Sequence, residues 1–298
     1  MPPAQATQLL AGGRIRPPAR ALERAGQAAR RARAAAQLRT AFISQADPAG
    51  PGGPVPPLAR MLRGGRGGQV RLKLYLSFLW FQTDGSRPVS LAYPSQVWAE
   101  LIGLEGDTGT RRVNEAQRWL EKHDFITIEA RPGHANRVTV LEETGTGTPY
   151  TPPGYAANRL RDTTAGLSHL YVQLPRELWT SGCMSVITGA GLAFLLVLLD
   201  QYGPGKIPDP TPPVWFSPKV LRDYYALSED TRAKGMNDLR ELGLVTVRRV
   251  PVNPDDFDLE RIRNTYTLNL NALGPARPST DSASGPAPQA DASPSAAR

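Results

Sequence analysis

The chain has 298 residues, of which 40% are hydrophobic and 21% charged, enough for a folded core and for two domains of ordinary size. Its 28 Gly and 29 Pro are clustered, which predicts folded modules that are joined and flanked by irregular segments. The single cysteine, Cys183, excludes an intramolecular disulfide framework and a four-cysteine zinc site, and the three isolated histidines exclude a histidine-rich metal site.

The net charge of +8 is concentrated at the N-terminus. Residues 1–69 carry 11 Arg and two acidic residues, a net charge of +9, whereas residues 70–271 and 272–298 are close to neutral. A basic arm on a neutral body predicts a polyanionic partner, nucleic acid before an anionic membrane. Because no apolar segment of the kind found in secretory signals follows the first basic residues, we expect a cytoplasmic protein.

Composition changes along the chain predict five segments. They are a basic Arg/Ala-rich arm with a Pro/Gly linker (1–69), a first folded block (70–141), a second linker (142–167), a second folded block (168–271) and a disordered tail (272–298). Residues 18–44 are rich in Ala and Arg and predict a helix, so we expect the arm to be disordered or partly helical. Residues 178–199 carry no charge, but Gly, Ser and Thr dilute them, which predicts a buried helix rather than a membrane span.

The two folded blocks, here called copy one (70–141) and copy two (168–271), resemble each other. Tyr93–Leu104 matches Phe216–Leu227, since both have a polar residue, apolar pairs four residues apart, a small residue and Leu. Phe125–Ile128 then matches Leu244–Val247. An internal repeat of this kind predicts two copies of one domain.

Each copy is predicted to contain three helices followed by a β-hairpin. In copy one the helices cover 72–81, 93–104 and 110–123, and the strands cover 125–130 and 137–141. In copy two the helices cover 191–201, 216–227 and 229–242, and the strands cover 244–250 and 264–270. The third helices present apolar residues inward, namely Val113, Ala116 and Leu120 in copy one and Met236, Leu239 and Leu242 in copy two.

This order of elements, with a Leu-x-x-Leu-Gly-Leu-Val junction at Leu239–Val245 before the hairpin, resembles a winged helix-turn-helix domain. A tandem pair resembles the replication initiators of plasmids and phages and some transcriptional regulators. Tyr171–Pro175, Leu178–Trp179 and Thr188–Leu192 are similar to the segment that leads into the winged helix of replication initiators of mobile elements. The resemblance covers residues 70–271 and implies an α+β, mainly α fold with two tandem winged helix-turn-helix domains. The acidic loop of the second hairpin is longer than the usual wing.

Such a domain lays its third helix in the major groove and its hairpin on the DNA backbone. The residues of copy one that this implies in DNA binding are Arg111, Arg112, Asn114, Arg118 and Lys122 on the third helix, and Arg131, Asn136 and Arg137 on the hairpin. Arg and Asn can make paired hydrogen bonds to guanine and adenine edges. The alternative is a solvated face of an amphipathic helix and an ordinary polar hairpin.

The corresponding residues of copy two are Thr231, Arg232, Lys234 and Asn237 on the third helix, and Arg248 and Arg249 on the hairpin. Because Asp230, Asp238 and Glu241 are interleaved with them, these side chains could instead pair with one another, and copy two could serve dimerisation. Arginines of the arm could add sequence-independent phosphate contacts or form a solubilising extension; they are Arg14, Arg16, Arg20, Arg30, Arg31, Arg33 and Arg39.

We expect no catalysis, no metal and no cofactor. The sequence lacks a Gly-x4-Gly-Lys phosphate loop and the His-x-His pair of metal-dependent nicking enzymes. Cys183 is predicted to be a core residue rather than a nucleophile, and Asp255-Asp256 have no ligand companions.

The sequence therefore predicts a sequence-specific double-stranded DNA-binding protein, and within that class a replication initiator of a plasmid, phage or integrated mobile element. Its expected partners are DNA, the replication machinery and a second copy of the chain. A transcriptional regulator and a winged-helix protein-interaction subunit of a chromosome-maintenance complex are the alternatives. A membrane-bound adaptor is disfavoured because the apolar stripe of the arm is thin.

Overall fold

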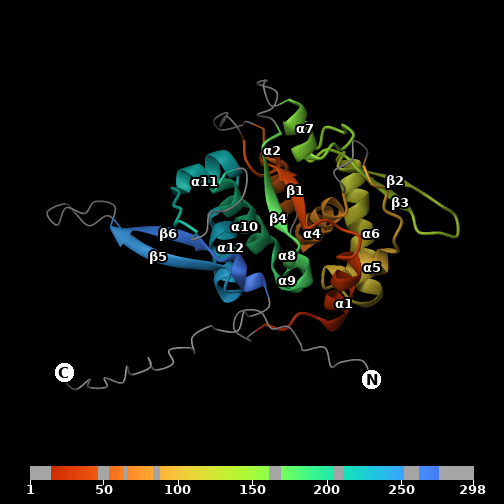
Figure 1. Ribbon diagram of the computed structural model, residues 1–298, viewed down its shortest axis with the longest axis horizontal. Helices are drawn as coiled ribbons and strands as arrows, with labels where there is room; N and C mark the ends of the chain where they lie inside the picture. The colour runs from red at the N-terminus through yellow and green to blue at the C-terminus, as the bar shows by residue number, and fades with distance from the viewer. Residues whose placement is uncertain are drawn as a thin grey trace, which may run out of the picture.

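The computed structural model describes residues 15–45, 54–63, 66–82, 88–160, 169–203, 211–251 and 262–274. In these ranges the chain is mainly α-helical with three two-stranded antiparallel sheets, which confirms the predicted α+β, mainly α class (Figure 1). The helices are α1 (Ala19–Ala28), α2 (Thr40–Ile43), α3 (Pro57–Leu62), α4 (Arg66–Trp80), α5 (Ser95–Leu101), α6 (Gly106–Lys122), α7 (Pro153–Arg159), α8 (Glu177–Thr180), α9 (Cys183–Val186), α10 (Gly189–Gln201), α11 (Pro218–Tyr225), α12 (Glu229–Glu241) and the 3-10 helix η3 (Leu270–Leu273). The strands are β1 (Ala35–Arg39), β2 (Ile126–Glu129), β3 (Arg137–Val140), β4 (Tyr171–Pro175), β5 (Val245–Pro251) and β6 (Ile262–Leu268).

Copy one contains the predicted three helices and hairpin. The helices are α4, α5 and α6, and α6 packs on both of the others through the buried side chains of Val113, Ala116 and Leu120. Strands β2 and β3 pair antiparallel behind it. Leu91, between α4 and α5, adds one bridge to this hairpin by exchanging two 2.8 Å backbone hydrogen bonds with Val138.

Copy two has the same order of elements. Helices α10, α11 and α12 are followed by the β5–β6 hairpin, and Val214, between α10 and α11, exchanges two 2.8 Å backbone hydrogen bonds with Tyr266. Side chains of Thr188, Ser217 and Ser228 accept hydrogen bonds from the first turns of the three helices, which explains where these helices begin.

The hairpins of the two copies agree residue by residue. The aligned residues Ile128 and Val247 face Val138 and Tyr266, the two residues that also hold the extra bridges. The amide of Phe125 donates to the Leu120 carbonyl at 3.0 Å, and the aligned amide of Leu244 donates to the Leu239 carbonyl at 2.8 Å. The repeat seen in the sequence is therefore also a repeat of backbone hydrogen bonds.

The two copies share one hydrophobic core, and their hairpins lie at opposite ends of the molecule (Figure 1). Helices α4 and α10 contact each other at the centre, and Trp80 stacks on Trp179 with ring centroids 4.7 Å apart. The indole N–H of Trp179 donates to Ser77 Oγ at 3.0 Å. Residues 192–199 of α10 are all buried, as expected for the uncharged segment, and no helix in the described ranges is both long and apolar enough to cross a bilayer.

The prediction of one helix over residues 18–44 is wrong between residues 29 and 39, and helical structure resumes only in α2. Helix α1 ends at Ala28, and Ala35–Arg39 forms strand β1, which pairs antiparallel with β4 from Ala35 opposite Pro175 to Arg39 opposite Tyr171. This pairing buries Leu38 in the shared core and satisfies the backbone groups of β4, so tertiary contacts override the helix propensity of Ala and Arg. Helices α3 and α7 lie within the segments predicted as linkers.

Some predictions concern residues outside the described ranges. These are the disorder predicted for residues 275–298 of the tail, the acidic loop of the second hairpin at residues 252–261 with Asp255 and Asp256, and the phosphate contact of Arg14. For residues 272 and 273 the predicted disorder is wrong, because η3 extends to Leu273, whose side chain is 1% exposed.

Candidate nucleic-acid interface

Helix α6 exposes most of the predicted DNA-contacting residues on one side. Arg111, Asn114, Arg118 and Lys122 are exposed, while Val113 and Leu120 on the opposite side are fully buried. The spacing of three and four residues places these polar side chains along one face of the helix. A face of this kind is long enough to present several side chains to one partner.

The exposed residues of α6 are only weakly engaged with the protein itself. Arg111 Nε lies 3.7 Å from the Glu115 carboxylate with both side chains more than half exposed, a pair that contributes little. Arg118 Nε donates to the Asn114 carbonyl at 3.3 Å, and Ser95 Oγ donates to Asn114 Oδ1 at 2.6 Å. The guanidinium groups of Arg111 and Arg118 therefore remain accessible to a partner.

Arg112 lies on a different side of α6. It is only partly exposed. Burial is the main cause that lowers the pKa of Lys73 on α4, and the charge of Arg112 adds to this effect. This position is closer to the interior than that of its neighbours Arg111 and Arg118.

The β2–β3 hairpin extends from the same copy. Its turn contains Gly133 with φ of +74°, a backbone conformation that favours glycine, and exposes His134 and Asn136. Arg131 and Arg137 are partly exposed, and Arg137 Nη1 donates to Glu129 at 3.1 Å. Figure 1 shows this hairpin beside α6, at the end of the molecule away from copy two.

A stack of side chains fixes the last turns of α6. Trp119 stacks on His123 with ring centroids 3.9 Å apart, and the guanidinium of Arg71 lies 4.4 Å from the Trp119 ring centroid. The i,i+4 spacing of Trp119 and His123 could have been recognised in the sequence. Arg71 comes from α4, so its contribution follows only from the packing of the two helices.

The third helix of copy two has fewer free charges. Arg232 lies 2.7 Å from Glu229 and Lys234 lies 2.8 Å from Asp230, so the internal pairing considered as an alternative occurs for both. Asp238 accepts 2.7 Å hydrogen bonds from the amide and hydroxyl of Thr188 at the start of α10, and burial raises its pKa.

The remaining predicted residues of copy two are dispersed. Thr231, Lys234 and Asn237 line an open groove of about 710 Å³ between α12 and the beginning of α10, with Gln69 on the other side. Arg248 and Arg249 are exposed on β5 of the second hairpin, at the opposite end of the molecule from the first. The structure thus gathers the predicted residues of copy one more closely than those of copy two.

The structure contains a buried ionic cluster around Arg39 that the sequence did not predict. The guanidinium of Arg39, at the end of β1 and 1% exposed, donates to the fully buried Glu143, lies 3.2 Å from Glu142 and donates from Nε to His169 Nδ1 at 3.2 Å. Burial raises the pKa of Glu143 against the opposing charge of Arg39. The predicted phosphate contact of Arg39 is therefore wrong, because its charge is enclosed in the protein.

Metal-ligating clusters and the single cysteine were considered as further candidate sites in the described part of the chain. No cluster of three His, Cys, Asp or Glu side chains suited to a metal ion occurs there. Cys183 lies in the core as predicted, and burial raises the pKa of its thiol to about 12, which keeps it protonated.

Comparison with known proteins gives no further guide. No family model matches the chain, and no curated protein and no solved structure is significantly similar to it.

Proposed function

We propose that the chain is a tandem winged helix-turn-helix protein that binds double-stranded DNA with sequence preference. The proposal is supported by the order of elements in each copy, which is three helices followed by a hairpin. In both copies one residue from the segment between the first two helices also forms a β-bridge to the hairpin. In winged helix-turn-helix proteins this arrangement presents the third helix to the major groove.

The observation that carries the proposal is the exposed face of α6. Arg111, Asn114, Arg118 and Lys122 lie along it; the two arginines make only long, exposed contacts, and Asn114 Oδ1 accepts a 2.6 Å hydrogen bond from Ser95. Arg and Asn suit hydrogen bonding to guanine and adenine edges, and Lys suits phosphate. The nearby hairpin would supply Arg131, Asn136 and Arg137 to the DNA backbone.

The test is selection of bound genomic fragments by the purified full-length protein at about 150 mM salt, a physiological ionic strength. We expect a defined motif, and we expect Arg118→Ala to lose about 1–3 kcal/mol of preference for that motif if Arg118 reads a base. Arg222→Ala is the matched control, because Arg222 is exposed on α11 beside Asp223, away from the proposed interface. A protein that is folded but enriches no fragment would refute DNA recognition.

Within this class we propose a replication initiator of a plasmid, phage or integrated element, on the resemblance of the tandem arrangement. Bound sites in direct repeats near an origin of replication would support it. Binding at single promoter palindromes would instead identify a transcriptional regulator.

A second candidate role applies to copy two, as a protein-interaction module. It is favoured by the intrahelical ion pairs of Arg232 and Lys234 and by the engagement of Asp238 with α10. If it holds, Asn237→Ala leaves the affinity for DNA unchanged while Arg118→Ala reduces it. Equal losses in the two variants would assign DNA contact to both third helices.

A further inference from the structure

A hydrogen bond between two helices orients the exposed amide side chain of α6. Ser95 Oγ, in the first turn of α5, donates to Asn114 Oδ1 at 2.6 Å. This distance is usual for O–H···O bonds and is shorter than the bonds that amide N–H groups make. The amide oxygen of Asn114 is therefore the atom that meets Ser95, and its amide nitrogen is the atom left for a partner.

The fold of the repeat does not require this bond. The N-cap residue of α5 is Pro94, so the hydroxyl of Ser95 does not cap its own helix. By the matches between the two copies, the positions in copy two that correspond to Ser95 and Asn114 are Pro218 and Ala233, and neither side chain can make such a bond. The pair is therefore particular to copy one, the copy with the exposed basic face.

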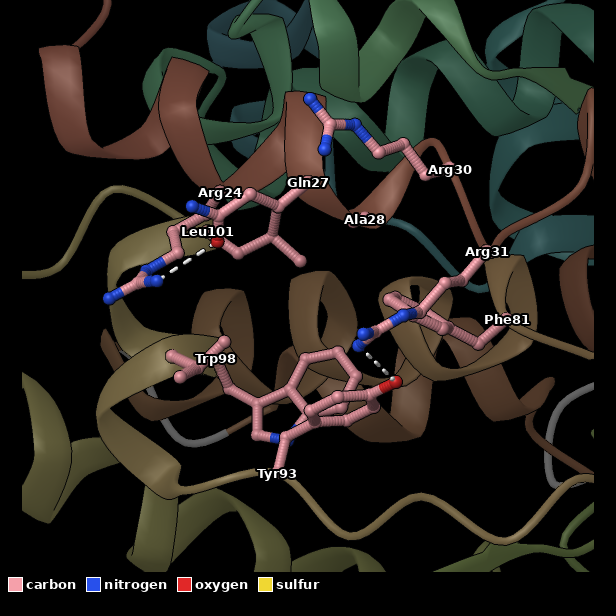
Figure 2. A pocket seen from close by; sticks show the side chains of 10 residues that line it. Arg24, Gln27, Ala28, Arg30, Arg31, Phe81, Tyr93, Trp98 and Leu101 are labelled. Carbon is pink, nitrogen blue, oxygen red and sulfur yellow. Dashed lines mark hydrogen bonds between the residues drawn. The ribbon is translucent and has the colours of Figure 1, made fainter.

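Helix α5 is a fixed support for Ser95. On one side Trp98 is 1% exposed and meets Phe78 edge-on, with ring centroids 4.8 Å apart. On the other side α1 packs on α5, and the two helices border a pocket of about 310 Å³ (Figure 2). Arg24 of α1 lies 2.6 Å from the carboxylate of Glu100 on α5. The position of the Ser95 hydroxyl is therefore set by the core and by α1, not by α6 alone.

The other exposed side chains of α6 fit the edges of G·C base pairs. Arg111, Arg118 and Lys122 carry N–H donors and no acceptor, and arginine suits the two acceptors of guanine. Glu115, beside Arg111, is an acceptor, and a glutamate suits the amino group of cytosine. Glu121 already accepts a hydrogen bond from a backbone amide of β2 at 3.1 Å.

Guanine and adenine differ in what they present to an asparagine in the major groove. Guanine presents two acceptors, a carbonyl oxygen and a ring nitrogen, whereas adenine presents one ring nitrogen and one amino donor. The paired contact of asparagine with adenine uses both the oxygen and the nitrogen of the amide. An amide whose oxygen is turned to Ser95 offers its N–H groups instead, which matches guanine.

We propose that Ser95 is a positioning residue that makes Asn114 a hydrogen-bond donor, so that copy one selects guanine rather than adenine at the base pair that Asn114 reads. The inference rests on the proposed function, because it requires α6 to lie in the major groove. It adds the base composition of the site, which is G·C pairs where α6 contacts it.

The experiment measures the affinity of the full-length protein for the selected DNA motif and for copies of the motif in which each base pair is replaced in turn. Asn114→Ala identifies the position that Asn114 reads, because the base preference there should disappear. At this position we expect the wild type to prefer guanine over adenine by about tenfold or more. Ser95→Ala should reduce the ratio to within about threefold, because the released amide can turn its oxygen toward the amino group of adenine.

Two variants separate the orientation of Asn114 from a general effect on α5. Ser95→Thr keeps the hydroxyl and should retain the preference for guanine. Gln96→Ala is the matched control, because Gln96 is the exposed neighbour of Ser95 and donates to Glu100 at 2.9 Å within α5. It should leave the base preference unchanged. The thermal midpoint of each variant shows that it is folded.

Three results would overturn the inference even if Arg118→Ala lowers the preference for the motif and so supports the proposed function. They are a preference for adenine at the Asn114 position in the wild type, no position that loses its preference in Asn114→Ala, and an unchanged ratio in folded Ser95→Ala. A folded wild-type protein that selects no motif would instead remove the proposed function and this inference together.

Discussion

Removing the carboxylate of Glu143 should destabilise the protein strongly, because it leaves the charge of Arg39 enclosed in the core. Arg39 is 1% exposed and Glu143 is fully buried, so neither charge is solvated by water. Breaking a buried ion pair at one partner costs about 3–5 kcal/mol. Arg39 keeps Glu142 at 3.2 Å and the Thr151 carbonyl at 2.7 Å, which places the loss for Glu143→Ala near the lower end, about 3 kcal/mol.

The measurement is urea unfolding followed by tryptophan fluorescence, with a thermal scan beside it. At about 2–4 °C per kcal/mol for a chain of this size class, the thermal midpoint should fall by roughly 6–12 °C. Glu129→Gln is the control, since Glu129 and its partner Arg137 are 61% and 42% exposed and their pair contributes under about 1 kcal/mol. A loss below about 1 kcal/mol in Glu143→Ala would refute the account of an enclosed Arg39 charge.

Three further predictions concern other parts of the core. Burial lowers the pKa of Lys73 from 10.5 to about 8, so between these pH values the unfolded chain binds more protons than the folded one. In chemical unfolding, the free energy of unfolding of the wild type should therefore rise from pH 8 to pH 9 by about 1 kcal/mol relative to Lys73→Met. The absence of this rise would show that Lys73 has an ordinary pKa. Gly235→Ala should lower the free energy of unfolding in urea by about 1–3 kcal/mol, because the new Cβ would lie 2.4 Å from the Ala190 carbonyl oxygen. Gly26→Ala, which has open space around it in α1, is the control and should stabilise the protein by about 0.5–1 kcal/mol. Equal effects of the two substitutions would contradict the close crossing of α10 and α12. Deleting residues 1–45 should lower the thermal midpoint, because the deletion removes β1 and its buried side chains. It should also lower any affinity for DNA. An unchanged thermal midpoint would show that this segment is a dispensable arm.

The elements of both copies could be predicted because their signals are local. Apolar residues recur at helical spacing in 110–123 and 229–242, and the observed α6 and α12 fall within a few residues of these ranges. The hairpins follow at once in both copies, and the alignment of Phe125–Ile128 with Leu244–Val247 already paired the residues that hold equivalent hydrogen bonds.

The sequence predicted the candidate interface only in part, and the physical reason differs between the two copies. Exposure of Arg111 and Arg118 follows from the burial of the opposite face of their own helix, which the sequence shows. Whether Arg232 and Lys234 are free or paired depends on which rotamers their acidic neighbours adopt, and composition alone left both outcomes open.

The sequence by itself determined the class of the fold, the repeat, the order of helices and hairpins and the buried nature of residues 192–199, since each depends on neighbours within one or two turns or one strand. Tertiary structure alone decided that Ala35–Arg39 is a strand, that Arg39 is enclosed by Glu143 and that α1 completes a pocket on α5. Arg39 and Glu143 are 104 positions apart, and no local period encodes which distant segment a strand or a charge will meet. Those contacts follow from the single core that the two copies build together.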